Sequence, residues 1–156
     1  MTDSSGKRVD SASRIIRAAP RAIYDAFMDP GALVSWLPPR GAIGHIQVFD
    51  PREGGAFRMT LVFGNAHGAG KTSDNTDEVA GRFVRLKPAE LIVQDIEFVS
   101  DDPVFAGTMT MTWKLDQVAD GTAVTITCEN VPSGISPEDH AAGLASTLAN
   151  LASWIE

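Results

Sequence analysis

The chain has 156 residues, of which 44% are hydrophobic and 21% charged, a composition typical of one soluble globular domain and not of a disordered or fibrous protein. Thirteen lysines and arginines against 20 aspartates and glutamates give a net charge of −7, which argues against binding to nucleic acid or to a membrane surface. Because the sequence has no membrane-spanning apolar run, no apolar signal-peptide core and Cys128 as its single cysteine, we expect a cytoplasmic protein without an internal disulfide.

The first predicted elements are a strand and two short helices. Residues 1–10 are polar and are expected to form a flexible leader, and a single domain then spans residues 11–156, beginning with a strand at residues 11–18. Pro20 suits the first turn of a helix, where its missing N–H has no intrahelical partner to lose. Apolar residues at helical spacing continue to Trp36, and the Pro38-Pro39 pair ends the second helix.

The hydrophobic period changes from helical to two between residues 40 and 131. Phe57, Met59 and Leu61 alternate with polar residues, and Met109, Met111 and Trp113 alternate with threonines. Strict alternation predicts a sheet with one face in a core and the other in water, and short turn-forming links predict an antiparallel meander. The predicted strands span residues 42–49, 57–63, 78–86, 91–99, 108–115 and 123–131.

The last predicted element is a long helix. Ser136 can cap it, Pro137 takes its first position, and two acidic residues follow in the first turn. Its predicted apolar stripe consists of Ala141, Leu144, Ala145, Leu148, Ala152 and Ile155. The pattern as a whole predicts an α+β fold, a curved antiparallel sheet of about seven strands wrapped around a long C-terminal helix.

Several motifs, in their order along the chain, resemble one branch of the START/Bet v 1-like (SRPBCC) superfamily, the activator of heat-shock-protein-90 ATPase homologue-like proteins. They are Ala19-Pro20, residues 36–39, 50–55 and 70–73, Thr76-Asp77, residues 100–103 and 105–107, residues 129–132, Gly134-Ile135, residues 138–140 and Gly143. The resemblance begins near residue 13 and implies the helix-grip fold, with a hydrophobic cavity between the sheet and the C-terminal helix. Members include lipid carriers, aromatic polyketide cyclases and chaperone cofactors. Many relatives carry Trp where this chain has Leu144.

The predicted inner face of the sheet supplies a candidate site for a small hydrophobic molecule. Long methionine and aromatic side chains there would face a run of small residues at positions 141–145 of the helix, which either packs tightly or leaves a hole. A hole of ~300 Å³ would cost about 7 kcal/mol, so it would not be a packing accident. The alternative is that these residues form an ordinary core. The candidate ligand contacts are Trp36, Phe57, Met59, Leu61, Gln94, Met109, Met111, Trp113, Leu144 and Leu148.

Charged residues near the middle of the sheet raise a catalytic alternative. Asp95 and Glu97 share one face of a strand, and inside an apolar cavity they would be able to act as acid and base. The opposite face of this strand is more apolar, so we expect both carboxylates in water and Gln94 inside as a hydrogen-bonding group for a ligand. The sequence does not decide which face of the sheet Arg58 and Arg82 occupy.

Other motifs favour ordinary structural roles. Residues 64–72 (GNAHGAGKT) resemble a phosphate-binding loop but lack its first glycine, and no helix is predicted to follow; we expect a mobile loop over one end of the cavity. His45, His67 and His140 lack metal-ligand spacing, and Cys128 is expected to be a small core residue. We therefore expect no metal and no cofactor.

Three functional hypotheses follow. The first is non-catalytic binding of a small hydrophobic molecule. The second is a polyketide cyclase, aromatase or hydrolase in the same cavity, which requires ionisable side chains there, such as Asp95, Glu97, Arg82 or His45. The third is a chaperone ATPase cofactor, which ranks last because such activators usually carry a further domain. Trp154 and Ile155 either complete the core or form a homodimer contact.

Overall fold

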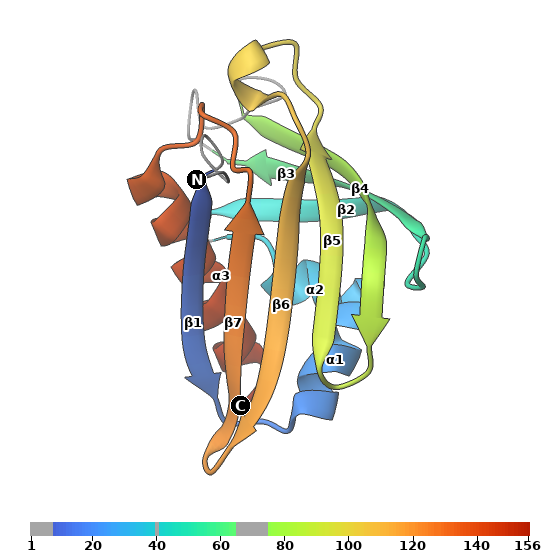
Figure 1. Ribbon diagram of the computed structural model, residues 1–156, viewed down its shortest axis with the longest axis vertical. Helices are drawn as coiled ribbons and strands as arrows, with labels where there is room; N and C mark the ends of the chain where they lie inside the picture. The colour runs from blue at the N-terminus through green and yellow to red at the C-terminus, as the bar shows by residue number, and fades with distance from the viewer. Residues whose placement is uncertain (1–7, 40, 65–74) are drawn as a thin grey trace, which may run out of the picture.

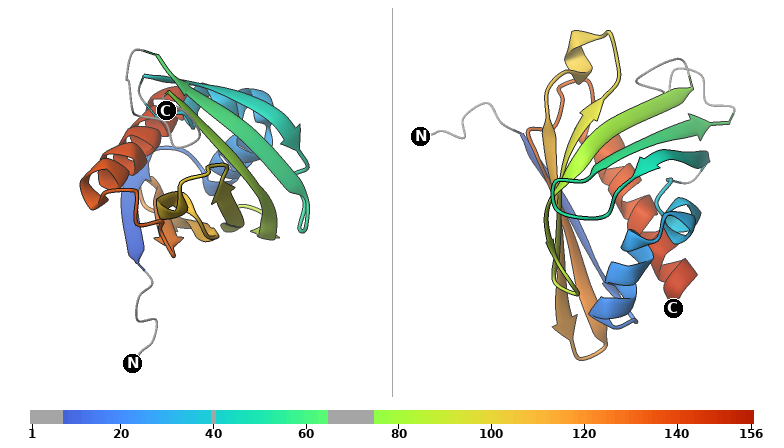
Figure 2. Two further views of the ribbon diagram at one scale, coloured as in Figure 1. Left: turned by 90° about the horizontal axis from the view of Figure 1, so that it is seen from above. Right: turned by 90° about the vertical axis from the view of Figure 1, so that its right-hand side faces the viewer.

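The computed structural model describes residues 8–39, 41–64 and 75–156. A seven-stranded antiparallel sheet has the order β1-β7-β6-β5-β4-β3-β2, and the helices pack on one of its faces (Figures 1 and 2). The strands are β1 (Val9–Ile16), β2 (Ala42–Phe49), β3 (Ala56–Phe63), β4 (Thr76–Lys87), β5 (Leu91–Phe98), β6 (Met109–Val118) and β7 (Gly121–Glu129). The helices are α1 (Pro20–Met28), α2 (Pro30–Trp36) and α3 (Pro137–Ile155), with a 3-10 turn η1 (Pro103–Phe105). This arrangement is the predicted α+β, helix-grip fold.

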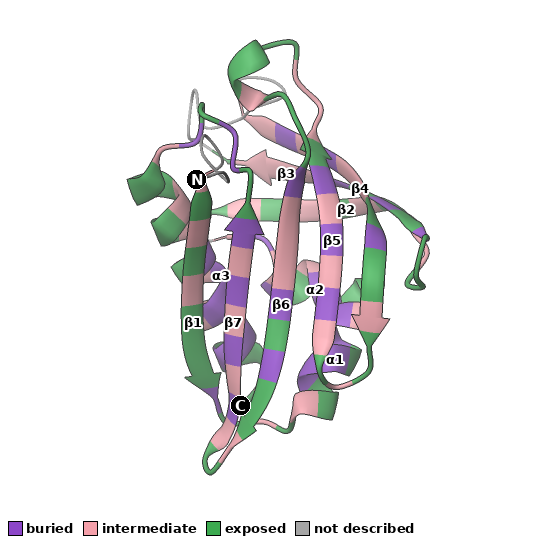
Figure 3. Cartoon of the chain, in the orientation of Figure 1, coloured by how far each residue is buried: buried purple, intermediate pink, exposed green. Residues whose placement is uncertain are grey.

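Strand alternation places the core on the helix side of the sheet. Buried and less buried residues alternate along β5 and β7, as Figure 3 shows. The first strand begins at Val9, two residues earlier than predicted, because Asp10 pairs with Cys128 of β7 and its carboxylate bonds to Arg8 and His140. Residues 1–7 lie outside the described residues.

Helix α3 begins as the sequence predicts, and its buried face shares Leu144, Leu148 and Ala152 with the predicted stripe but is turned away from Ala141 and Ala145. The Ser136 hydroxyl accepts a hydrogen bond from the Asp139 N–H at 3.0 Å. Ala141 and Ala145 of the predicted stripe are exposed, so that part of the prediction is wrong. Larger side chains face the core instead, which removes more apolar surface from water. The buried residues of α3 are Leu144, Thr147, Leu148, Leu151 and Ala152.

Three aromatic rings join the first two helices to the sheet. Phe27 of α1 lies 5.7 Å from Trp36 of α2 and 5.0 Å from Trp113 of β6, measured between ring centroids. The two tryptophan rings are 5.8 Å apart, and all three pairs meet edge to face. Trp36 donates its indole N–H to the Ala26 carbonyl at 3.2 Å. The cluster therefore fixes α1 and α2 against the middle of the sheet.

The segment that follows α2 is held between α3 and β2. Thr147 donates its hydroxyl hydrogen to the Leu37 carbonyl at 3.0 Å, and the Asn150 amide donates to the Pro38 carbonyl at 2.9 Å. On the other side, a Cβ at Gly44 of β2 would lie 2.9 Å from Pro38 Cγ, so glycine permits this close approach. The end of α2 is thereby positioned over the sheet edge formed by β2 and β3.

Candidate ligand-binding site

An apolar hollow lies between α2 and the sheet, and we refer to it as the inner hollow. Its volume is about 20 Å³, which is room for a single water molecule. Side chains from α2, the segment after it and three strands surround it. The lining residues are Leu33, Leu37, Ile46, Phe49, Phe57, Arg58, Met59 and Gln94.

Local structure explains why these residues converge. On β3, the period of two turns Phe57 and Met59 toward the helices and Arg58 toward the other face, where its guanidinium pairs with Glu78. On β2, the register with β3 shifts between Ile46 and Val48. Such a bulge changes the alternation, so that Ile46 and Phe49 lie on the same side although they are three residues apart.

Gln94 is the polar side chain that faces the inner hollow. It is 7% exposed, its amide has no hydrogen-bond partner among the other described residues, and its amide atoms are not fully enclosed but stay open toward the hollow. A second polar group also lacks a partner in the described part of the chain, the buried indole N–H of Trp113. The expectation that Gln94 points inward is confirmed, and its role toward a ligand remains a prediction.

The candidate residues named from the sequence fall into three groups. Phe57, Met59 and Gln94 line the inner hollow. Leu61 and Met111 are half-buried and pack against the core. The others lie within the packed core: Trp36, Met109, Trp113, Leu144 and Leu148. Sequence reasoning did not include Leu33, Leu37, Ile46 and Phe49, although the helical spacing before Pro38 already marked Leu33 and Leu37 as apolar neighbours.

The predicted apposition of large sheet residues and small helix residues is wrong. Ala141 and Ala145 are exposed, and Leu144 and Leu148 are the residues of this stretch that are buried in the core. The inner hollow is far smaller than the ~300 Å³ at the lower end for ligand sites. Its described lining comes from α2, the segment after it, and the sheet, with no residue of α3.

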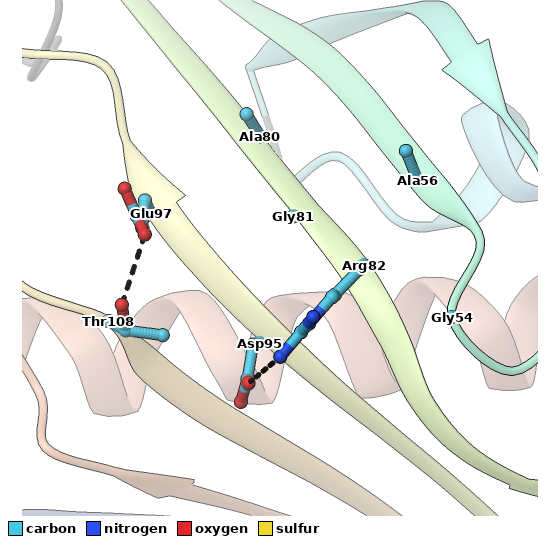
Figure 4. Close-up of a pocket in the computed structure, with 8 residues that line it drawn as sticks. All are labelled: Gly54, Ala56, Ala80, Gly81, Arg82, Asp95, Glu97 and Thr108. Carbon is cyan, nitrogen blue, oxygen red and sulfur yellow. Dashed lines mark hydrogen bonds and ion pairs between the residues drawn. The ribbon is translucent and has the colours of Figure 1, made fainter.

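A larger, polar depression lies on the opposite face of the sheet, and we call it the outer hollow (Figure 4). Its volume is about 460 Å³. Arg82, Asp95 and Glu97 line it, above small residues at positions 54, 56, 80 and 81. The Arg82 Nη2 lies 4.0 Å from Asp95 Oδ2, and Glu97 accepts a hydrogen bond from the Thr108 hydroxyl at 3.1 Å.

The outward direction predicted for Asp95 and Glu97 is therefore confirmed. Asp95 also accepts a hydrogen bond from the Thr110 hydroxyl at 2.9 Å, and Arg82 is largely exposed to water. His45 is likewise exposed, on β2. None of these four ionisable residues lines the inner hollow as described.

The remaining motifs carry no reactive centre that the described residues show. Cys128 is 0% exposed, and burial, with a smaller effect from the Asp10 charge, raises the pKa of its thiol to about 12, so it stays protonated as a core residue. His140 bonds to Asp10 at 2.6 Å. No three metal-binding side chains come together among residues 8–39, 41–64 and 75–156. His67 and most of the glycine-rich segment fall outside the described residues.

Comparison with known proteins places the chain among proteins of the same fold. A family model described as activator of Hsp90 ATPase homolog 1-like protein matches residues 17–156. A structure from Chromobacterium violaceum is 32% identical, covers 95% of this chain and 96% of its own, and has a TM-score of 0.84. At lower identity, the likeness concerns the fold alone. A protein from Rhodobacter sphaeroides is 18% identical (94% and 95% covered, TM-score 0.76), and the AHSA1 protein from Silicibacter pomeroyi is 17% identical (94% and 96% covered, TM-score 0.76).

No match was found among curated proteins. Within the described part of the chain, no helix has both the length and the apolar character needed to cross a bilayer.

Proposed function

Because the chain belongs to the activator of Hsp90 ATPase homolog 1-like family, with the fold its motifs resembled, we propose that it binds a small hydrophobic molecule without acting on it chemically. The site is the inner hollow, between the sheet and the helical layer. The molecule sits beneath α2, against Phe57 and Met59, and reaches Gln94. In the cell, the protein would carry or sense this molecule in the cytoplasm.

The observation that carries the proposal is an apolar hollow with one free polar group at its wall. Apart from Gln94, and from Arg58, whose guanidinium pairs with Glu78, the described lining is aliphatic, aromatic or thioether. These side chains offer no acid, base or nucleophile toward the hollow, which favours binding over catalysis. Burial of apolar ligand surface supplies the affinity, at about 25 cal/mol per Å² before the costs of association.

The hollow must widen to admit a guest larger than water. Three of its lining side chains, Leu37, Ile46 and Phe49, are half-buried and therefore border solvent on one side. Their movement opens the hollow outward and leaves the fully buried aromatic cluster in place. Met59 has three rotatable bonds and a polarizable sulfur, so it adapts to guests of different shape.

The proposal is tested by thermal unfolding in the presence of a panel of small apolar compounds. A ligand that binds the folded state alone raises the melting temperature with its concentration. Ile46→Phe fills the hollow, and we expect it to abolish the shift. Ile43→Phe is the matched control, since Ile43 lies on the same strand but is 66% exposed on the other side, and we expect it to retain the shift. Failure of every compound to stabilise the protein, or equal shifts in both variants, would overturn the proposal.

A further inference from the structure

The free amide of Gln94 defines the chemistry of the guest more narrowly. We infer that the molecule bound in the inner hollow is neutral and carries a hydrogen-bond acceptor oxygen, such as a ketone, aldehyde or ester carbonyl, to which Gln94 donates. The inference rests on the proposed function and deepens it by naming the ligand class.

A survey of the buried polar side chains singles out Gln94. In the described part of the chain these are Asp77, Gln94, Thr122 and Thr147. Thr122 donates to the Ala18 carbonyl at 2.7 Å, and Thr147 donates to the Leu37 carbonyl at 3.0 Å. Asp77 also has an interaction partner. The amide of Gln94 alone in this set has no partner among the described residues, and it borders the inner hollow.

Such an amide is unusual in a protein interior. More than nine in ten buried polar groups in folded proteins find a hydrogen-bond partner, because a buried group without one loses its bonds to water and gains nothing in exchange. Leucine or methionine at position 94 would cover the same apolar wall at no such cost. The hollow has room for one water molecule that would satisfy the amide, and a guest that displaces this water must replace its hydrogen bond, which a guest with an acceptor oxygen does.

The neighbouring strand presents a second unpaired donor on the same face. Gln94 pairs with Met111 in the register of β5 and β6, and Trp113 lies two residues farther along β6. Side chains in such diagonal positions are about 7–8 Å apart at their Cα atoms. The indole N–H of Trp113 is buried and unpaired among the described residues, and an indole N–H donates but never accepts. This donor lies in the packed core and does not line the inner hollow, so Gln94 is the donor that a guest there can reach.

The buried charges indicate that the guest is neutral. Among the described residues, the charged side chain in the buried set is an acid, Asp77, and no lysine or arginine is buried with it. A carboxylate or phosphate guest would lose its hydration without gaining a buried cation. An ammonium guest would lose its hydration against the aliphatic and aromatic wall of the hollow. A neutral carbonyl compound has a much smaller desolvation cost than these ions, and its oxygen can accept a hydrogen bond from the Gln94 amide.

The test compares two neutral compounds with the same ring skeleton, indane and 1-indanone, by calorimetric or fluorescence titration. We expect the wild-type protein to bind 1-indanone about tenfold more tightly than indane, as one buried hydrogen bond predicts. Gln94→Met keeps the shape of the side chain and removes its polar atoms. In this variant we expect the two affinities to converge within about threefold, and the ligand-free variant to melt no lower than the wild type because no unpaired amide remains.

Gln117→Met is the matched control, since Gln117 is exposed on β6 and outside the hollow, and it should leave the tenfold preference unchanged. In nitrogen-15 spectra, the side-chain amide signals of Gln94 should shift with 1-indanone and not with indane, which reports the contact even if the variant folds poorly. Equal affinity for both compounds in the wild type, or a preference that survives Gln94→Met, overturns this inference and leaves the proposed function standing. If neither compound binds, this inference is overturned, and the panel of apolar compounds in thermal unfolding then decides the proposed function separately.

Discussion

Gly81 of β4 is a position where the packing of the sheet excludes any side chain. A Cβ there would lie 2.1 Å from the Asp95 carbonyl oxygen and 2.8 Å from Cζ of the Phe57 ring, which lines the inner hollow. The backbone oxygen cannot turn away as the end of a flexible side chain would. Glycine at this point therefore allows β5 and the Phe57 ring to approach β4 together.

We predict that Gly81→Ala lowers the free energy of unfolding by about 1–3 kcal/mol, because relief of the clash must move strand β5 or the Phe57 ring. The measurement is urea unfolding followed by circular dichroism. The control is Gly143→Ala on α3, where a Cβ meets nothing within 4 Å and alanine should stabilise the helix by about 0.5–1 kcal/mol. A neutral Gly81→Ala variant would contradict the packing described here.

At the scale of single residues, the sequence predicts which face of the sheet a side chain occupies better than it predicts which groups that side chain contacts. Period-two alternation was sufficient to turn Gln94 inward and to turn Asp95 and Glu97 outward, because successive side chains of a strand must point to opposite faces. The lack of a partner for the Gln94 amide depends on which side chains of α2, β2 and β3 surround it. These come from segments more than 30 residues away, and local spacing does not encode their positions.

At the scale of elements, Asp10 connects the first strand to the last helix. Its carboxylate accepts hydrogen bonds from Arg8 Nη2 at 2.8 Å and Arg8 Nε at 3.1 Å, and His140 Nδ1 of α3 lies 2.6 Å away. The hydrogen bond from Arg8 lowers the pKa of Asp10, helped by His140, and outweighs the opposing effect of burial. The residues that hold the start of α3 against β1 therefore include a titrating group.

This depressed pKa predicts an acid-sensitive part of the stability. The contribution of Asp10 is fully present above its ordinary pKa of 3.8 and is lost as the pH falls through the lower pKa of the folded state. We expect Asp10→Asn to cost about 1.5–3 kcal/mol at pH 7, as loss of a charged hydrogen bond does, and to flatten the decline of stability below about pH 4.

Urea unfolding of both proteins between about pH 2.5 and pH 7 measures this effect. Asp25→Asn is the control, because Asp25 forms an exposed pair with Arg21 on α1 and should change stability by less than about 0.5 kcal/mol. If the free energy of unfolding changes with pH in the same way in the wild type and in Asp10→Asn, the charge of Asp10 does not contribute to the acid sensitivity.

The helices and strands were largely predictable from the sequence. Which face of α3 packs against the sheet was not. The strands at residues 57–63 and 108–115 were found because they alternate strictly, and the other strands from weaker patterns between turn-forming residues. The helices were found because proline, serine and acidic residues mark their starts. On α3, a stripe through Ala141 and Ala145 satisfied helical spacing as well as one through Thr147 and Leu151. The choice between them was made by the sheet, which buries the larger side chains, and by the Thr147 hydrogen bond to the end of α2.

At the scale of the whole molecule, the first and last strands of the chain lie side by side. β1 pairs with β7 along its full length, from Val9 with Glu129 to Ile16 with Thr122, and α3 packs beside β1 (Figure 1). The middle of the chain is linked to these ends through β6, which pairs with both β5 and β7. The part of the core under β1, β7 and α3 therefore forms only when segments from both ends of the chain come together.

We predict from this closure that the described fold unfolds in one cooperative step. Urea transitions followed by tryptophan fluorescence and by far-ultraviolet circular dichroism should coincide. Trp154→Phe sharpens the comparison, because Trp154 is 46% exposed whereas Trp36 and Trp113 are buried in the aromatic cluster and report on the core. Separate midpoints for the two signals would show that one part of the sheet is stable alone.

The overall fold could be predicted because the elements, their order and the family motifs all agree with it. The position of the hollow could not, since it depends on the bulge in β2 between Ile46 and Val48 and on how closely Pro38 approaches Gly44. Both depend on how the segment after α2, β2 and β3 pack against one another. The sequence indicated an apolar interior with one inward amide, and the structure places the available space under α2 and away from α3.

The small volume of the inner hollow also has a kinetic consequence. A guest that finds space for only about one water must wait until Leu37, Ile46 and Phe49 have swung aside, so its arrival is governed by motions of the protein more than by diffusion. Departure requires the same rearrangement. Residence is then long for a given affinity, and a cellular occupant acquired during expression would persist through purification, where native mass spectrometry detects it.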